Sequence, residues 1–450
     1  MKITPVILAA GQGTRMRSAL PKVLHPVLGQ PMLSYVLEAT QAVCEEKPVV
    51  VIGHEAGLVR QAFEETAEFI VQEPQLGTGH AVMQAEKLLK GKTDLVLVVA
   101  ADMALLRAET LGKLVKMQET HDGPITMLTV VGEDPRGFGR VVRETGGRVL
   151  QVVEEAQATV EQLNIRELNT SVYCFEADWL WRALKQIMLS PKGEYYLTDL
   201  VAIAAAEDRS VMAYVLDDPH EAIGINTRVH LAEAEAWLRS QVNHQWMLSG
   251  VTIIDPATTY IERGVRIGQD SVIWPNTYLR GTTLVGEGCT LGPNTILTDT
   301  SVGDRCQVLA SVVEGAVVED HVHIGPYSHL RKGAHLAQGV YIGNFGEIKN
   351  SYLGSETHVG HFSYIGDATL GSHVNVGAGT ITCNFDGEKK NATEIGSEAF
   401  IGSDTMLIAP VKLGEGARTG AGSVVTRDVA AHTLVAGVPA RAIRKLEKRD

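Results

Sequence analysis

The chain has 450 residues, of which 45% are hydrophobic and 21% charged, which is the composition of a folded protein with sizeable cores. Its length exceeds that of one compact core, so we expect two or three domains. The formal net charge of −13 argues against general binding to nucleic acid or to an anionic membrane surface. Any phosphate that the protein binds must therefore be met by local basic groups.

Cysteine usage and hydropathy favour a cytoplasmic protein. The N-terminal apolar run is short and ends in a polar glycine loop, and the longest later run, residues 95–106, is broken by Asp102, so we expect no membrane-spanning segment. The cysteines lie far apart without a CxxC pair, which predicts reduced, mostly buried thiols. They are Cys44, Cys174, Cys289, Cys306 and Cys383.

The first half of the chain alternates strand-like and helix-like segments. Helix-like patterns cover residues 32–45 and 55–63, and β-rich runs cover residues 4–9, 49–53, 95–100 and 125–131. The alternation predicts an α/β domain with a mostly parallel sheet covered by helices, to which we assign residues 1–228.

One amphipathic helix is predicted to follow this domain. Apolar residues recur at spacings of three and four over about residues 227–248, and we assign residues 229–250 to a connecting helix. The apolar positions are Leu231, Ala234, Leu238, Val242 and Trp246.

Residues 251–450 follow a different pattern. They hold 27 glycines, against 18 in residues 1–250, and their aliphatic residues fall at intervals of six. An α-helix with 3.6 residues per turn cannot keep such a repeat on one face. A left-handed parallel β-helix of hexapeptide repeats can, because each repeat forms one side of a triangular prism and points its aliphatic residue to the axis.

The repeat is long and strict. Glycines follow many of the aliphatic residues, where we expect the chain to turn the corners of the prism. The aliphatic series comprises Ile267, Ile273, Leu279, Val285, Leu291 and Leu297, then Val318, Ile324, Leu330, Leu336, Ile342 and Ile348, and further sets up to Val425.

An insert interrupts the repeat between Thr382 and Ile395. The prism could be only a scaffold or an assembly platform. Loops carried on rigid scaffolds, however, are where functional sites concentrate, and we therefore expect the insert, residues 383–391, to be functional.

A glycine turn follows the first predicted strand. Gly11 and Gly13 would expose backbone N–H groups suited to phosphate oxygens, and Arg15 and Lys22 add positive charge. The same residues could form only a tight strand-to-helix turn. The motif is neither GxGxxG nor a Walker loop, which disfavours NAD binding and P-loop ATP hydrolysis.

Asp102 ends the apolar run at residues 95–101. In open α/β folds the ligands bind at this edge of the sheet, and Mg²⁺ would accept this carboxylate together with phosphate oxygens. A solvated aspartate at the end of a strand is the alternative.

Further motifs extend across the chain: LAAGQGTRM with LPKVLH, residues 72–81 and 137–140, Glu154, residues 168–170, 193–199 and 224–228, and, in the second half, residues 360–367 with the insert. Together they make the whole chain resemble the bifunctional bacterial N-acetylglucosamine-1-phosphate uridyltransferase / glucosamine-1-phosphate acetyltransferase family. The resemblance implies a Rossmann-like nucleotidyltransferase domain followed by the β-helix.

For the first domain the resemblance implies a Mg²⁺-dependent transfer from UTP to N-acetylglucosamine-1-phosphate, as an in-line displacement. Arg15 and Lys22 would face the phosphates, and Asp102 and Asn226 would be the metal ligands. The nucleotide would contact Leu8, Ala10, Gly11, Gln72, Gly77 and Thr78, and the sugar would contact Gly139, Glu154 and Asn169. The family usually has Gly-Asp-x-Pro at the metal aspartate, whereas this chain has Ala101-Asp102-Met103-Ala104.

For the prism the resemblance implies acetyl transfer from acetyl-CoA to glucosamine-1-phosphate, with His361 as the base that takes the amine proton. Glucosamine-1-phosphate would be held by Arg331, Lys349, Tyr364 and Asn375. Acetyl-CoA would contact Ala378, Asn384, Phe385, Ser403 and Ala421. Phe385 stands where tyrosine is usual, and the other histidines between residues 321 and 373 are expected on the prism surface.

The resemblance also implies a homotrimer acting on small molecules in UDP-N-acetylglucosamine synthesis, without nucleic acid or membrane partners. Two alternatives remain from the residues: a single-activity sugar-1-phosphate nucleotidyltransferase with a structural prism, and a non-enzymatic nucleotide-binding assembly protein. The basic C-terminal residues, Arg441, Arg444, Lys445, Lys448 and Arg449, are expected to form a solvated tail.

Overall fold

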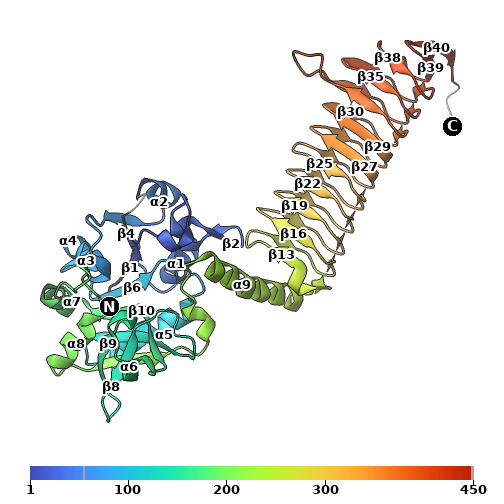
Figure 1. Ribbon diagram of the computed structural model, residues 1–450. Helices are drawn as coiled ribbons and strands as arrows, with labels where there is room; N and C mark the ends of the chain where they lie inside the picture. Colours follow the sequence, from blue (N-terminus) through green and yellow to red (C-terminus); the bar gives the residue numbers. More distant parts are fainter. Residues whose placement is uncertain (54–55, 447–450) are drawn as a thin grey trace. The chain divides into compact units, whose positions relative to one another are not determined.

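The computed structural model describes residues 1–53 and 56–446 and divides into two compact units, residues 1–238 and residues 239–450 (Figure 1). Within the described part of the chain, no helix is both long enough and apolar enough to cross a membrane.

Unit 1 is a mixed sheet with helices on both sides. Its strand order is β11-β7-β10-β6-β1-β4-β5, and a β8–β9 hairpin pairs with β10. The strands are β1 (Ile3–Ala9), β4 (Val49–Ile52), β5 (Glu68–Val71), β6 (Leu95–Ala100), β7 (Ile125–Val131), β8 (Arg140–Arg143), β9 (Val149–Val153), β10 (Glu167–Glu176) and β11 (Val211–Val215); β2 (Pro26–Val27) and β3 (Gln30–Pro31) pair separately.

Alternate residues of the strands face two separate cores. Val6 belongs to the core that is covered by α3, α7 and α8, whereas its neighbour Ile7 belongs to the core that is covered by α1, α2 and α5. The helices are α1 (Met32–Gln41), α2 (Ala56–Phe63), α3 (Gly77–Met83), α4 (Glu86–Leu89), α5 (Ala108–Thr120), α6 (Val160–Leu163), α7 (Ala177–Ala183) and α8 (Asp199–Ala206).

The predicted strands and helices of unit 1 are confirmed, with ends shifted by a few residues; residue 55, the start of one predicted helix, lies outside the described residues. Strands β5, β8, β9, β10 and β11 were not predicted. Of these, β10 runs antiparallel to both β6 and β7, while the other neighbours on the main path are parallel. The chain reaches β10 after the β8–β9 hairpin and the short α6, without the long helical crossover that parallel neighbours need.

Helix α9 (Arg228–Leu248) confirms the predicted connecting helix, but its apolar stripe serves two cores. Leu231 and Leu238 pack in unit 1, whereas Val242 and Trp246 pack against the core of the prism. The division between the units falls inside this helix.

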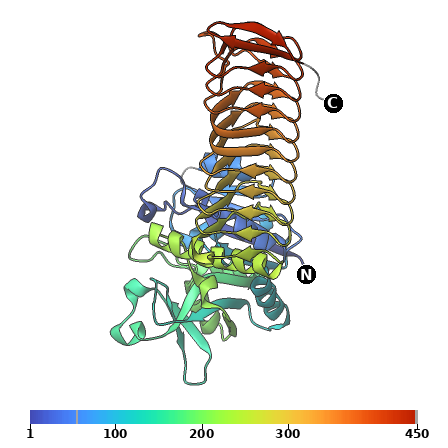
Figure 2. The same cartoon turned by 90° about the vertical axis from the view of Figure 1, so that its right-hand side faces the viewer.

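Unit 2 is the predicted prism of stacked coils, whose rungs align along each face (Figure 2). Face A contains β12 (Thr252–Ile253), β15 (Val272–Ile273), β18 (Thr290–Leu291), β21 (Gln307–Val308), β24 (His323–Ile324), β31 (Asn375–Val376), β34 (Phe400–Ile401) and β37 (Arg418–Thr419).

Face B contains β13 (Thr259–Ile261), β16 (Thr277–Arg280), β19 (Ile296–Thr298), β22 (Val312–Glu314), β25 (His329–Leu330), β32 (Ile381–Cys383), β35 (Met406–Ile408) and β38 (Val424–Val425). Two longer strands, β27 (Tyr341–Lys349) and β29 (His358–Gly366), cross the corner from face A to face B. We call this corner the A/B corner.

Face C contains β14 (Arg266–Ile267), β17 (Leu284–Val285), β20 (Ser301–Val302), β23 (Val317–Val318), β26 (His335–Leu336), β28 (Tyr352–Leu353), β30 (Ala368–Leu370), β33 (Thr393–Ile395) and β36 (Val411–Leu413). The described residues also form short 3-10 helices: η1 (Thr14–Met16), η2 (Lys22–Leu24), η3 (Glu155–Gln157), η4 (Leu184–Gln186), η5 (Pro219–Ala222) and η6 (Pro256–Thr258).

The six-residue aliphatic series forms the core of the prism, as predicted. Ile273, Leu291 and Leu407, for example, have no exposed side-chain surface. Parallel rungs pair Ile267 with Val285, 18 residues apart. Val285 then pairs with Val302, 17 residues apart, so the single-residue slips in the sequence are shortened coils that keep the aliphatic residue inside.

The repeat glycines stand where the chain leaves a strand and turns, as expected: Gly268, for example, directly follows β14 and precedes the turn at residues 269–270. A second reason for glycine is close contact, because a Cβ added to Gly268 would lie 2.6 Å from the carbonyl carbon of Gly286 in the next coil. Such glycines permit close stacking of the coils. The left-handed corner positions are often filled by other residues, such as Asp270 and Asn276.

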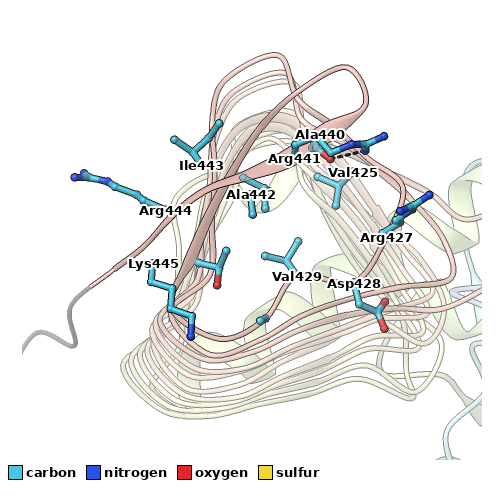
Figure 3. Close-up of a pocket in the computed structure, with 13 residues that line it drawn as sticks. Val425, Arg427, Asp428, Val429, Ala440, Arg441, Ala442, Ile443, Arg444 and Lys445 are labelled. Atoms are coloured by element: carbon cyan, nitrogen blue, oxygen red, sulfur yellow. Dashed lines mark hydrogen bonds between the residues drawn. The ribbon is translucent and has the colours of Figure 1, made fainter.

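The basic C-terminal residues were expected to form a solvated tail; Arg441, Arg444 and Lys445 are exposed as expected, but they belong to a strand and not to a tail. Strand β40 (Ala440–Lys445) pairs antiparallel with β39 (Thr433–Gly437) and lies across the end of the prism (Figure 3). The hairpin borders a cavity of about 480 Å³ whose lining includes Val425, Val429 and Ala442. Lys448 and Arg449 lie outside the described residues.

Candidate functional site

The glycine turn brings Lys22 to the edge of the sheet. Gly13 has a φ of +62° at the start of η1, and a Cβ there would lie 2.8 Å from the Cβ of Lys22, at the start of η2. Only a glycine fits this approach without a shift. The ammonium of Lys22 donates to Oδ2 of Asp102 at 2.7 Å and to Oδ1 of Asn226 at 3.1 Å.

Arg15 joins the same group. Its Nη2 atom donates to Oδ1 of Asn226 at 3.0 Å. The amide of Ile225 also donates to the Asp102 carbonyl at 3.0 Å, which ties the residue after β6 to the segment before α9. Four predicted residues from four separate segments therefore meet in one place. We call Arg15, Lys22, Asp102 and Asn226 the Lys22 cluster.

The oxygens of the Lys22 cluster fit a magnesium ion. Asp102 and Asn226 direct one carboxylate and one amide oxygen to the same ammonium group, and Mg²⁺ prefers oxygen ligands completed by water and phosphate. Within residues 1–53 and 56–446 there is no group of three or more His, Cys, Asp and Glu side chains that could hold a metal by itself. Ala101, Met103 and Ala104 are buried, so the altered sequence around Asp102 still anchors it.

The predicted base residues lie at the start of α3, on the loop before it and at the end of β1. Nε2 of Gln72 donates to the carbonyl of Gly77 at 2.9 Å, and the amide of Leu197 donates to Oγ1 of Thr78 at 3.0 Å. Ala10 packs in the same core as α3. Gly11 is exposed, and an added Cβ there would meet nothing within 4 Å, so its backbone is open to a ligand. Leu8, in β1, precedes Ala10 and Gly11 in the sequence and is partly exposed.

The predicted sugar residues surround the β8–β9 hairpin. The amide of Asn169 donates to the carbonyl of Gly139 at 2.9 Å, and Oε1 of Glu154 accepts from Thr198 at 2.9 Å. Burial raises the pKa of the Glu154 carboxyl above its ordinary value, and burial followed by the charge of Glu154 raises the pKa of Asp199. No role was assigned to Thr198 or Asp199, although residues 193–199 had been noted as a motif.

His361 lies at the A/B corner, in the middle of β29, and is exposed. Successive coils place Ala378, Ser403 and Ala421 above it at the same corner. The contacts are between backbones: Gly379 donates to the Phe362 carbonyl, Asp404 to Ala378 and Gly422 to Ser403, at 2.7–2.9 Å. The predicted base therefore lies at the foot of a column of predicted acetyl-CoA residues, which we call the His361 column.

A cationic group lies along face B. Arg331 donates to Oε1 of Glu347 at 3.0 Å. The pKa of Lys349 lies below its ordinary value, because the neighbouring Lys390 ammonium and then Arg331 disfavour a further positive charge, while Asp367 opposes the shift. Lys390 lies in the insert that was expected to be functional, but no role of its own was predicted. Its place in a loop that interrupts the repeat was the available signal.

The base of the insert is tied to face B. Nδ2 of Asn384 donates to Oδ2 of Asp367 at 2.6 Å and to the hydroxyl of Tyr364 at 3.4 Å. Phe385, the next residue, is 61% exposed and free to contact a ligand. Asn375 is not brought to this group within one chain, because it pairs with His358 on face A.

The remaining histidines confirm their predicted surface placement. His323, Tyr341 and His358 stack in successive coils of face A, with ring centroids 4.9 and 5.7 Å apart. All five cysteines are free, and four are buried, while Cys383 is partly exposed.

Comparison with known proteins matches both units. Residues 5–240 match the MobA-like NTP transferase domain, and residues 264–299 and 392–427 match the bacterial transferase hexapeptide model. The Bifunctional protein GlmU of Streptococcus equi subsp. zooepidemicus is 43% identical over 97% of this chain and 95% of its own length. That of Desulfitobacterium hafniense is 46% identical over 95% of this chain and 94% of its own length. The chain therefore belongs to the family of bifunctional GlmU proteins, which are transferases with a nucleotidyltransferase unit and a hexapeptide-repeat unit.

Proposed function

We propose that this enzyme makes UDP-N-acetylglucosamine in two steps. Unit 2 acetylates glucosamine-1-phosphate with acetyl-CoA, and unit 1 transfers UMP from UTP to the N-acetylglucosamine-1-phosphate, with release of pyrophosphate. The observation that carries the proposal is the pair of separate polar sites, one in each unit: the Lys22 cluster and the His361 column.

In uridylyl transfer, an oxygen of the sugar phosphate attacks the α-phosphorus of UTP, and the bond to the β-phosphate oxygen breaks as pyrophosphate leaves. Arg15 and Lys22 would hold the triphosphate in line and offset its charge. Gln72, Gly77 and Thr78 would hold the base beside Leu8, Ala10 and Gly11. Gly139, Glu154 and Asn169 would hold the sugar.

Asp102 and Asn226 would hold a magnesium ion. When bound, this ion neutralises phosphate charge. Lys22 would exchange its contacts with these two side chains for contacts with phosphate oxygens, because its flexible ammonium can move between acceptors.

In acetyl transfer, the amine of glucosamine-1-phosphate attacks the thioester carbonyl. His361 would take the amine proton as the C–N bond forms, and the C–S bond then breaks to release CoA. Arg331, Lys349, Tyr364 and Asn375 would bind glucosamine-1-phosphate, the two cations on its phosphate. The His361 column, with Asn384 and Phe385, would contact acetyl-CoA.

The active form for acetyl transfer would be a cytoplasmic homotrimer. Two observations support shared sites: Asn375 lies on face A while Lys349 and Tyr364 lie on face B of the same chain, and exposed aromatic rings follow the A/B corner. Those rings are Tyr327, Phe345 and Phe362, each more than half exposed. A continuous row of exposed aromatic rings typically becomes buried in an interface between protein chains.

A substrate-omission assay tests the proposal. Purified protein should release thiol only with glucosamine-1-phosphate and acetyl-CoA, and pyrophosphate only with UTP, N-acetylglucosamine-1-phosphate and magnesium. Thiol release that does not depend on glucosamine-1-phosphate would contradict the acetyl-transfer assignment. Pyrophosphate release without any thiol release would instead support a single-activity nucleotidyltransferase with a structural prism.

A further inference from the structure

Arg228, the first residue of α9, contacts two segments that carry the cations of the Lys22 cluster. Its Nε atom donates to the carbonyl of Met16 at 3.3 Å, and its Nη1 atom lies 3.2 Å from Nδ1 of His25. Met16 directly follows Arg15 in η1, and His25 follows η2, which begins with Lys22. One guanidinium thus bridges both segments.

The helix end that carries Arg228 is itself fixed next to Asn226. Oγ1 of Thr227 accepts the amide of His230 at 3.2 Å, which is the pattern of a helix N-cap. The amide of Leu231 donates to the Thr227 carbonyl at 3.0 Å. Because Asn226 directly precedes this cap, the first turn of α9 connects three segments of the Lys22 cluster: those of Arg15, Lys22 and Asn226.

The contact between Arg228 and His25 determines the protonation state of the imidazole. A guanidinium has no acceptor, so Nδ1 of His25 must accept its hydrogen bond and the imidazole must be neutral. His25 is buried, and this burial, followed by the charge of Arg228, lowers the pKa of His25. Met16 is buried as well, so both contacts of Arg228 attach to fixed points of the core.

We propose that Arg228 is a positioning residue for uridylyl transfer, which holds the Arg15 and Lys22 segments at the distance from Asn226 that the reaction needs. This inference rests on the proposed function of unit 1. Arg15 is exposed and its side chain is long, so the position of its guanidinium relative to a phosphate depends on how rigidly η1 is fixed. Arg228 does not touch the reacting atoms in this account.

The first test is Arg228→Met, which keeps a helix-forming, unbranched side chain but removes every donor. We expect kcat/KM for UTP in pyrophosphate release to fall about 10- to 100-fold, the loss typical of a displaced catalytic group. Thiol release by unit 2 should stay within about twofold, which shows that unit 2 is folded; the folding of unit 1 is checked by its thermal unfolding. Glu233→Gln is the matched control, because it weakens another contact of α9, the pair with Arg136 at 2.6 Å, and it should leave both activities unchanged.

A pair of variants at the partner separates positioning from folding. In His25→Asn the side-chain carbonyl can take the place of Nδ1 as acceptor, whereas His25→Leu fills the site without an acceptor. His25→Asn should keep kcat/KM within about threefold, while His25→Leu should resemble Arg228→Met. The double variant Arg228→Met/His25→Leu should be no worse than the poorer single variant, because both remove the same contact.

The inference is overturned if Arg228→Met keeps kcat/KM within about threefold, if the two single losses multiply in the double variant, or if His25→Asn loses as much as His25→Leu. If Arg228→Met does not fold, the His25 pair decides the question alone. A wild-type chain that releases no pyrophosphate from UTP, N-acetylglucosamine-1-phosphate and magnesium would instead overturn the proposed function.

Discussion

The ammonium of Lys22 and the carboxylate of Asp102 form a 2.7 Å ion pair in which each side chain is only 15% exposed. Lys22→Met would leave that carboxylate without its partner, which lowers the unfolding free energy of unit 1 by about 1–3 kcal/mol. It would also remove a cation from the triphosphate, so we expect pyrophosphate release to fall at least about 100-fold. Thiol release should not change. Equal losses of both activities would contradict separate sites.

Asp102→Asn should change the magnesium requirement of unit 1. The substitution keeps the shape of the side chain but removes its charge, and we expect the magnesium concentration for half-maximal pyrophosphate release to rise at least about tenfold. This concentration is measured by titrating magnesium with the wild-type protein and with Asp102→Asn. Removal of the metal with a chelator should stop pyrophosphate release by the wild-type protein and spare thiol release; an unchanged magnesium titration in Asp102→Asn would exclude the carboxylate as a ligand.

His361→Asn tests the base at the foot of the His361 column. The amide cannot take a proton from the attacking amine, so thiol release should fall about 10²- to 10⁴-fold. Pyrophosphate release from supplied N-acetylglucosamine-1-phosphate should be that of the wild type. Thiol release that survives the substitution would assign the base to another residue.

Lys390→Met should change the alkaline pH dependence of acetyl transfer. Because Lys390 lowers the pKa of Lys349, Lys349 loses its proton at a lower pH than an ordinary lysine, and its attraction for the substrate phosphate fails there. Without Lys390 the rise in KM for glucosamine-1-phosphate should move to higher pH, measured from about pH 8 to about pH 10.5.

The neighbouring Lys389→Met is the control for that change and should keep the wild-type profile. Identical profiles for the wild type and Lys390→Met would show that Lys390 does not act on Lys349.

Gly268→Ala should destabilise the prism by about 1–3 kcal/mol, because its Cβ would overlap the backbone at Gly286. Gly360→Ala is the comparison, since its Cβ would meet nothing within 4 Å. Thermal unfolding of the two variants measures the difference. A Gly268→Ala prism as stable as Gly360→Ala would mean that the coils can separate at no cost.

The sequence predicts the prism well because one local rule governs it. Each aliphatic residue such as Ile342 is buried by its own rung and its nearest neighbours, so a six-residue period is enough to find the core. The same rule places Gly268 at a corner but does not show its close approach to the next coil, because contact between backbones of successive coils leaves no mark in the periodicity.

The sites were less predictable because they depend on distant segments. Lys22 meets Asp102 across 80 positions of the sequence and Asn226 across 204, and no local pattern encodes those contacts. The contact between Arg228 and His25 also joins segments that are far apart in the sequence, so no local pattern predicts it. The antiparallel direction of β10 was not predicted either, since it depends on pairing with the distant strands β6 and β7.

Complementation in trans tests the central claim, that one chain carries two independent sites, most directly. Lys22→Met and His361→Asn are each incubated alone, and then mixed, with glucosamine-1-phosphate, acetyl-CoA, UTP and magnesium, while UDP-N-acetylglucosamine is measured. We predict almost no product from either variant alone and restored product from the mixture, because the acetylated intermediate can pass from one variant to the other. A mixture as inactive as its components would contradict the account.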